Sequence, residues 1–373
     1  MRMNLVFYIV LLFSSKLFGI TDYTEIDKKS LCVPDSLKTA DQISGYLTKD
    51  LKNDVEKIRA FYIWISNNIN YDLGNRGTTK RFKSKAEVID DVLKNRKGIC
   101  QQYAELFHVF CKKSGIKSFV IGGYARNGQK QISDVGHSWN AVQIGTNYYF
   151  IDVTWASGFT INNVYLNQFR DEFFLIEPQL FVKTHLPFDP VWQFSDNPVT
   201  IFDFNNQNFL KLSEKGNYNY RAFIAEIENQ DRLTYLEKVN KRLFGLDELN
   251  DLLLDEIKEN AFQIAYEKGR IAADSYNTAT DNFNLYIRHK NARFRNPDIE
   301  DAKLLELISD VERPLYKADF MFQNVFTFNS DLRNQFSRFQ KSIQEFEAKL
   351  KIESAFINKY IKTKRPFRFL QFI

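Results

Sequence analysis

Hydrophobic positions in the first third of the chain recur at helical spacing. One apolar stripe follows Leu51, and its members are Val55, Ile58, Tyr62, Ile65 and Ile69. This stripe predicts an amphipathic helix that begins near Leu51. Similar patterns predict a second helix over residues 85–94 and a third over residues 100–114, with Gly115 at the position of a left-handed helix C-cap. Gly98 interrupts the pattern between these two helices and permits a sharp turn there.

The pattern then becomes extended. Residues 118–125, 137–144 and 148–155 are rich in β-branched and aromatic side chains, which is typical of strands. Helices that precede a group of neighbouring strands predict an α+β fold, with helices packed on an antiparallel sheet. Beyond Trp155 the chain reads as irregular up to about residue 205.

The turn between the last two predicted strands sets their register. Gly145-Thr146 favours a two-residue type II′ hairpin, which pairs Ile144 with Asn147. In this register His137 and Asp152 share one face of the sheet as diagonal neighbours, roughly 7–8 Å apart at the backbone. A three-residue loop would place them on opposite faces.

The second half of the chain has a helical pattern of hydrophobic residues and many charged residues. Residues 246–293 predict one long helix or two, a further helix begins near Asp298 and meets Pro314, and the last spans about residues 330–362. This half is predicted to be a helical bundle or a long antiparallel hairpin of helices. The predicted organisation is an N-terminal segment over 20–50, an α+β domain over 51–205 and a helical accessory domain over 206–373.

Composition and charge narrow the classes of function. A chain of 373 residues is long enough for two domains. The net charge of +5 is small for this length and is spread along the chain, so we expect no nucleic-acid partner.

The first residues have the features of a secretory signal. Arg2 precedes an apolar run over residues 5–13, which is shorter than the roughly 20 residues that cross a bilayer. We therefore predict a cleavable signal peptide over residues 1–19 and export to the periplasm or the cell exterior. An uncleaved anchor and a buried N-terminal helix are the alternatives.

The chain has three cysteines, which are Cys32, Cys100 and Cys111. An odd count in an exported protein leaves at least one thiol free, although Cys32 and Cys111 could pair. Cys100 is the one that stands at a predicted helix start, where unpaired N–H groups and the helix dipole favour a thiolate. The same N–H groups could stabilise an oxyanion.

Cys100, His137 and Asp152 together supply a nucleophile, a base and a group that orients the base. Taken singly, each has an ordinary structural alternative: a small buried thiol, a strand histidine, a carboxylate at a strand end. The remaining histidines, His108, His185 and His289, show no metal-ligand spacing, and no glycine-rich phosphate loop is present. We therefore predict no metal site and no cofactor.

Four motifs carry a resemblance to a known family. They are Ile58-Arg59-Ala60-Phe61-Tyr62-Ile63-Trp64-Ile65 with Ile69-Asn70-Tyr71-Asp72, then Arg96-Lys97-Gly98-Ile99-Cys100-Gln101-Gln102-Tyr103-Ala104, Gly136-His137-Ser138-Trp139-Asn140 and Ile151-Asp152-Val153-Thr154-Trp155. Over about residues 50–195 the chain resembles the transglutaminase-like superfamily, in the papain-like cysteine-enzyme group. The segment around His185-Leu186-Pro187 and Trp192-Gln193 is similar to the kyphoscoliosis-peptidase-like branch and to related bacterial proteins.

The resemblance implies a transglutaminase-like, papain-like core with a catalytic triad of Cys100 as nucleophile, His137 as general base and acid, and Asp152 as orienting group. It implies acyl transfer from an amide of a protein or peptide substrate, by a protease, an amidase or a transglutaminase. We expect Gln101, Trp139 and Trp155 to support substrate binding or the oxyanion. His185 could contribute to the site or merely pack near it, and packing is the preferred interpretation.

Two further interpretations stay open at this point. The domain could be catalytically silent and bind peptide or cell-surface polymer, with the helical half as an interaction arm. Separately, the basic and aromatic C-terminal end, residues 362–372, could make weak contact with an acidic lipid surface or a partner. The alternative for this end is a solvated tail that packs its phenylalanines on the bundle.

Overall fold

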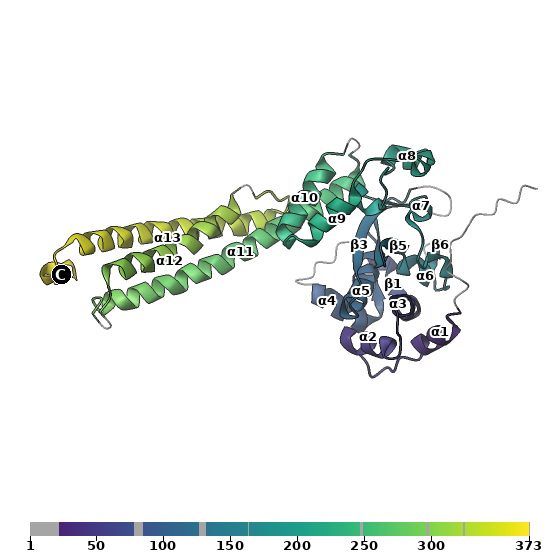
Figure 1. The fold of residues 1–373 in the computed structure, drawn as a ribbon, viewed down its shortest axis with the longest axis horizontal. Coiled ribbons are helices and arrows are strands. Elements are labelled where there is room, and N and C mark those ends of the chain that lie inside the picture. The colour runs from purple at the N-terminus through teal and green to yellow at the C-terminus, as the bar shows by residue number, and fades with distance from the viewer. Residues whose placement is uncertain are drawn as a thin grey trace, which may run out of the picture. The chain divides into compact units, whose positions relative to one another are not determined.

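The computed structural model describes residues 22–77, 85–126, 132–162, 164–246, 249–295, 298–323 and 325–372. The chain divides into two compact units, Met1–Tyr218 and Asn219–Ile373 (Figure 1). The predicted signal peptide, residues 1–19, lies outside the described residues. Within the ranges above, none of the helices combines the length and the apolar content that spanning a membrane requires.

Helices precede the sheet of the first unit along the chain. They are α1 (Thr24–Leu31), α2 (Ala40–Thr48), α3 (Asp54–Asn68), α4 (Lys85–Asn95) and α5 (Cys100–Lys113). The predicted helices near 51–69, 85–94 and 100–114 are confirmed as α3, α4 and α5. Gly115 follows α5 with φ of 73°, as a left-handed C-cap requires.

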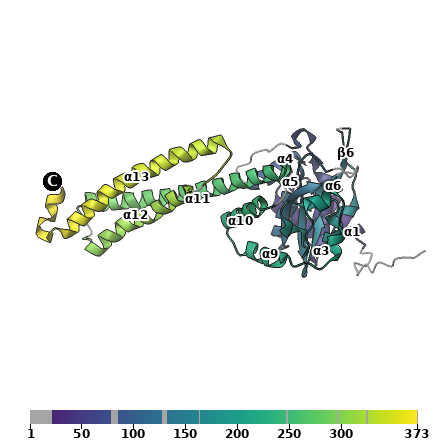
Figure 2. The same cartoon turned by 90° about the horizontal axis from the view of Figure 1, so that it is seen from above.

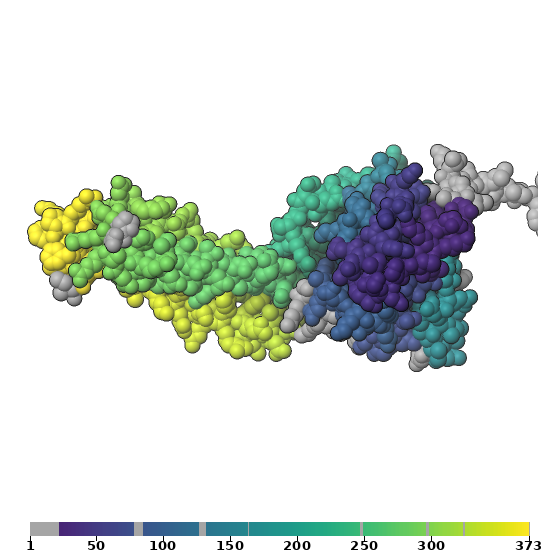
Figure 3. All heavy atoms as spheres, turned by 90° about the horizontal axis from the view of Figure 1, so that it is seen from below, coloured from purple at the N-terminus to yellow at the C-terminus, as the bar shows by residue number. Residues whose placement is uncertain are grey.

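Helices α1 and α2 were not predicted from the sequence. The capping box of Thr39 and Gln42 starts α2, and the helix buries Ile43 and Leu47 in the main core. In Figure 3 the N-terminal residues, drawn in purple, cover one face of the first unit. The segment over residues 20–50 therefore contributes two packed helices to this unit.

The sheet has four antiparallel strands in the order β5-β4-β3-β8. Their bounds are Asn147–Ile151 for β5, His137–Ile144 for β4, Ser118–Ala125 for β3 and His185–Pro187 for β8. Ile144 pairs with Asn147, and Gly145 has φ of 61°, so the predicted two-residue turn and its register are confirmed.

The predicted strand over residues 148–155 is wrong at its end. β5 stops at Ile151, and the short helix α6 (Val153–Ser157) begins directly after it. The reason is Asp152, whose Oδ1 accepts the backbone N–H of Trp155 at 3.0 Å and so caps the helix.

The core of the first unit lies between α3, α5 and the sheet. Phe61 and Trp64 of α3 pack their rings on Phe110 of α5, with centroid distances of 5.4 and 5.7 Å. Val142 of β4 and Ile151 of β5 are buried in the same cluster. Burying each of these side chains stabilises the fold by roughly 1.5–3 kcal/mol. This packing holds α5 against α3 and the sheet.

Short elements connect these parts, including the segment that was predicted as irregular. They are β1 (Asn70–Tyr71), η1 (Leu73–Asn75), β2 (Lys97–Gly98), β6 (Phe159–Ile161), β7 (Val164–Leu166), η2 (Asp171–Phe173), α7 (Pro178–Phe181), η3 (Pro190–Gln193), α8 (Ile201–Asn205) and η4 (Leu210–Ser213). β1 pairs in parallel with β2, and β6 pairs with β7 as a hairpin.

The second unit is helical, as predicted. It contains α9 (Tyr220–Glu228), α10 (Arg232–Phe244), α11 (Asp251–Asn291), α12 (Asp301–Phe322), α13 (Ser330–Lys362) and η5 (Arg365–Phe372). Within the predicted segment 246–293, α11 is one continuous helix, so the alternative of two helices is wrong. Helices α11, α12 and α13 run beside one another (Figures 1 and 2).

Two apparent helix breakers sit inside these long helices. A Cβ on Gly269 would lie 2.8 Å from the ring of Phe336, so glycine lets α13 approach α11 closely. Pro314 lies within α12 and leaves the carbonyl of Asp310 without its usual donor, and the side-chain amide of Asn282 in α11 donates to that carbonyl at 2.7 Å. Packing between helices thus compensates for both residues.

The C-terminal end folds back on its own unit. Arg368 forms two ion-pair hydrogen bonds of 2.6 and 2.7 Å with Asp301, and Phe372 contacts the rings of Phe294, Phe356 and Tyr360. Phe367 stays exposed. The suggested contact of this end with lipid or a partner stays a prediction.

Candidate active site

Cys100 is the first residue of α5. The preceding Ile99 donates its backbone N–H to the side-chain oxygen of Gln102 at 2.9 Å, and Gln102 lies against Gly98, where a Cβ would meet it at 3.1 Å. Together these contacts shape the turn that places the Cys100 thiol at the start of α5. Cys100 itself is partly exposed.

The surroundings of Cys100 favour its thiolate. Burial raises the pKa of the thiol, but a hydrogen bond with His137, the charge of that ring and the backbone N–H of Ser138 lower it. The net pKa of Cys100 lies below its ordinary value.

The other two thiols differ from Cys100. Cys32 is exposed, Cys111 is buried so that desolvation raises its pKa, and both are free. The pairing of Cys32 with Cys111, which the sequence left open, is absent from this structure.

His137 is the first residue of β4, and its Nε2 lies 2.7 Å from Oδ2 of Asp152. Burial alone would lower the pKa of His137, but the charge and hydrogen bond of Asp152, together with the Cys100 sulfur, raise that pKa to about 10. Because Nε2 faces the carboxylate, Nδ1 is the ring nitrogen left for the sulfur. The structure thus brings Cys100, His137 and Asp152 together.

Asp152 is fully buried between β5 and α6. Burial raises the pKa of this carboxyl, but the hydrogen bonds and charges of His137 and His185 outweigh it and hold the pKa well below its usual range. The carboxylate is therefore ionised in a site without water contact, where only strong donors can keep it so.

His185 of β8 is a part of the site whose role the sequence left open. Its Nε2 lies 3.2 Å from Oδ2 of Asp152, and its Nδ1 lies 2.8 Å from Oγ1 of Thr184. Burial lowers the pKa of His185 to about 4, against the raising effect of Asp152. The expectation that His185 packs near the site is met, but the ring also bonds to the triad carboxylate. His185 reaches the site through the pairing of β8 with β3, which are far apart in the sequence. The periodicity of helices and strands therefore gave no signal for its position.

Two of the three predicted supporting residues lie at the site. Trp139 is buried and Trp155 is partly exposed, and their rings lie 6.0 and 5.4 Å from that of His137. Gly123 of β3 makes room for this packing, because a Cβ there would lie 2.6 Å from the Trp139 ring. Gln101 is exposed on the first turn of α5, and its support of substrate or oxyanion stays a prediction.

The donor atoms of His137, Asp152 and His185 lie within 4.8 Å of one another, which is close enough to surround a metal ion. Hydrogen bonds already account for both ring nitrogens that face the carboxylate. The arrangement is therefore explained by hydrogen bonding alone, and we assign no ligand role to these residues.

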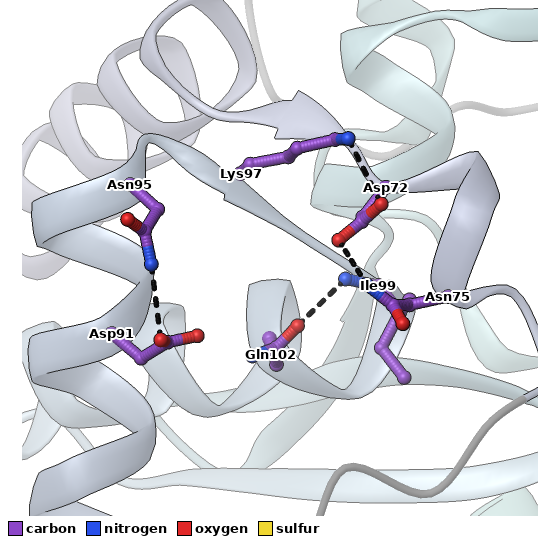
Figure 4. Close-up of a pocket in the computed structure, with 7 residues that line it drawn as sticks. All are labelled: Asp72, Asn75, Asp91, Asn95, Lys97, Ile99 and Gln102. Carbon is purple, nitrogen blue, oxygen red and sulfur yellow. Dashed lines mark hydrogen bonds and ion pairs between the residues drawn. The ribbon is translucent and has the colours of Figure 1, made fainter.

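A surface pocket adjoins the turn before Cys100 (Figure 4). It has a volume of about 280 Å³ and is lined by Asp72, Asn75, Asp91, Asn95, Lys97, Ile99 and Gln102. Lys97 pairs with Asp72 at 3.0 Å, and Asn95 donates to Asp91 at 3.0 Å. The charged and amide groups that line the pocket thus largely satisfy one another.

The fold and this site define the class of the first unit. Residues 41–154 match the model of the Transglutaminase-like superfamily. The first unit therefore contains a transglutaminase-like core, in which helices pack on an antiparallel sheet as in papain-like enzymes, and a large helical region follows it.

Known proteins resemble only a part of the chain. The chain is 30% identical to human kyphoscoliosis peptidase over 178 residues, 46% of this chain and 26% of that protein. It is 25% identical to hillarin of Drosophila melanogaster over 213 residues, 51% of this chain and 25% of that protein. The chain thus spans about a quarter of the length of these relatives. Among solved structures, an arylamine N-acetyltransferase from Bacillus cereus matches at 17% identity with a TM-score of 0.26, over 36% of this chain and 49% of that one.

Proposed function

We propose that this chain is an exported cysteine-dependent enzyme of the kyphoscoliosis-peptidase-like branch that transfers the acyl group of an amide. One observation carries the proposal: the His137 ring has Asp152 at 2.7 Å on one nitrogen and the Cys100 sulfur as its other hydrogen-bond partner. A thiolate beside an imidazolium is the resting state that attack on an amide requires.

The proposed reaction has two steps. The Cys100 thiolate attacks the amide carbon, and the His137 imidazolium gives its proton to the departing amine, which leaves an acyl thioester on the sulfur. Water or a second amine then attacks the thioester while His137 takes up the proton of the attacking group. The second attack breaks the bond between carbon and sulfur and restores the thiolate. Asp152 stabilises the imidazolium that is present before the first step and again after the second. The backbone N–H groups at the start of α5 are suited to hold the oxyanion.

The identity of the acceptor decides between a protease or amidase and a transglutaminase. The name of the human relative, a peptidase, supports water as acceptor and a protein or peptide as substrate. Export is proposed from residues 1–19 alone, and N-terminal sequencing of the exported chain checks it, with a mature end near Gly19 as the expected result.

The test uses a fluorescent primary amine and a mixture of unstructured proteins with the purified chain. Hydrolysis gives new peptide N-termini, and transfer gives fluorescent proteins. Cys100→Ser and His137→Ala should each lower the product by at least about 100-fold. Cys32→Ser is the matched control, because Cys32 is exposed and distant in sequence from the triad, and it should leave the rate unchanged.

The same assay addresses the alternative of a silent binding domain, with the helical half as an interaction arm. A protein that retains substrate in a pull-down but makes neither product, and whose Cys100 reacts with iodoacetamide no faster than Cys32, would contradict the enzyme proposal.

A further inference from the structure

We propose that His185 is a positioning residue of this active site: its ring donates a second hydrogen bond to Asp152 and so fixes the carboxylate that orients His137. The inference rests on the proposed function, because it assigns a role within the same acyl-transfer site. It extends the predicted triad by one residue that comes from a different strand.

The contacts of Asp152 carry the first step of the argument. Its Oδ2 accepts from Nε2 of His137 at 2.7 Å and lies 3.2 Å from Nε2 of His185, and its Oδ1 accepts the N–H of Trp155 at 3.0 Å. These three donors come from β4, β8 and α6, and the carboxylate is fully buried. A buried carboxylate stays ionised and in one orientation only when such donors surround it.

The chemistry of the carboxylate fixes the tautomer of His185. An ionised carboxylate can only accept hydrogen bonds, so Nε2 of His185 must carry a proton. Nδ1 lies 2.8 Å from Oγ1 of Thr184, whose hydroxyl can donate either to Nδ1 or to the carbonyl of Phe181 at 3.2 Å. Burial lowers the pKa of His185 to about 4, so the ring is neutral near pH 7 and does not compete with His137 for the positive charge, which two imidazolium rings on one carboxylate would do.

The surroundings of His185 hold the ring in place. Phe181 stacks on it with a centroid distance of 4.1 Å and an angle of 13°, and Trp155 contacts it at 4.3 Å. The pairing of Ala125 with His185 ties β8 to β3. A histidine that only filled space would account for this packing, but it would have no influence on the reactivity of Cys100. That difference makes the proposal testable.

The experiment measures the rate of Cys100 alkylation by iodoacetamide as a function of pH, in the full chain with Cys32→Ser to remove the exposed thiol. His185→Leu removes the donor and keeps an apolar side chain. His185→Gln places an amide N–H where Nε2 stood. His108→Leu is the matched control, because His108 bonds to Ser118 and not to the triad.

We expect the alkylation rate of Cys100 to fall by about tenfold across the pH profile in His185→Leu, since a carboxylate that has lost one donor no longer holds the His137 ring in one orientation beside the sulfur. His185→Gln should restore most of the original profile, and His108→Leu should match the parent. The other titratable groups that respond to the charge of Asp152 are Tyr62, Tyr71 and Tyr165, and because burial raises their pKa values they stay neutral across this profile.

The outcomes separate this inference from the proposed function. Superimposed profiles of the parent and His185→Leu, with the enhanced rate lost in His137→Ala, would overturn the role of His185 and leave the enzyme proposal standing. A parent thiol that titrates like an ordinary cysteine, unchanged by His137→Ala, would overturn both. If His185→Leu does not fold, nitrogen NMR of histidine-labelled parent protein decides: a proton on Nε2 of His185 supports the proposal, and a bare Nε2 refutes it.

Discussion

Two histidines at the site show how strongly a partner decides the charge of a side chain. The rings of His137 and His185 are both buried, lie 5.6 Å apart and face the same carboxylate oxygen. Yet the pKa of His137 rises to about 10 and that of His185 falls to about 4. His137 has the shorter contact with Asp152 and also the sulfur of Cys100, whereas His185 additionally meets the positive charge of His137. One carboxylate thus supports one imidazolium.

This difference predicts how stability depends on pH. The unfolded chain protonates His185 below about pH 6.5, and the folded chain does so only below about pH 4, so the free energy of unfolding falls as pH falls through this window. The loss amounts to at most about 3 kcal/mol. His185→Gln should flatten the curve between pH 4 and 6.5 in urea unfolding monitored by fluorescence. An unchanged slope in that variant would show that His185 titrates normally in the folded chain.

From the sequence, a residue of this site could be placed only where its position depends on residues close to it in the chain. Cys100 was placed by the glycine turn and the helix start, and His137 and Asp152 were placed on one face by the two-residue turn at Gly145. His185 needed the pairing of β8 with β3, which joins segments some sixty residues apart, and no local pattern contains that information.

At the scale of elements, local capping overrode strand propensity. Val153, Thr154 and Trp155 are typical strand residues, but Asp152 caps them into α6. The same carboxylate therefore ends a strand, starts a helix and orients His137. In the N-terminal segment, α1 and α2 are short and largely polar, so their hydrophobic pattern was too brief to be recognised as helical.

Arg59 joins three elements of the first unit, and this predicts a loss of stability on its removal. It is 4% exposed, bonds to Asp27 of α1 at 2.7 and 2.8 Å, and also bonds to Asp171 of η2. Arg59→Ala should lower the free energy of unfolding by about 2 kcal/mol, less than for a fully buried pair because both partners are partly exposed.

The control for this prediction is Lys57→Ala on the same helix. Lys57 forms a looser pair with Asp54, at 3.6 Å and nearer to solvent, and its removal should cost less than about 0.5 kcal/mol. Equal effects of the two substitutions in urea unfolding would mean that Arg59 does not hold α1 and η2 to α3.

At the scale of the whole molecule, each unit has a hydrophobic core of its own. The main cluster of the first unit spans residues 40–173, and that of the second spans residues 272–360. Sequence analysis predicted that the second unit is helical and gave the approximate span of its last α-helix, α13. It could not show that α11 continues past Gly269, because the ring of Phe336 that occupies the missing side chain comes from a distant helix.

Separate cores predict separate unfolding transitions. Leu315 is buried in the second core and Ile58 in the first. Leu315→Ala and Ile58→Ala should each destabilise their own unit by about 3 kcal/mol, and each should lower the midpoint of only one of two calorimetric transitions. A single transition that both substitutions shift equally would show that the units unfold together.

The uninterrupted course of α11 also sets a length scale. A helix of 41 residues extends about 60 Å, and α12 and α13 lie along it and brace it against bending. Its two ends are therefore held at a nearly constant separation. Two molecules bound at opposite ends of α11 would therefore be kept apart by the length of the helix. A flexible linker with the same number of residues would not keep them apart in this way.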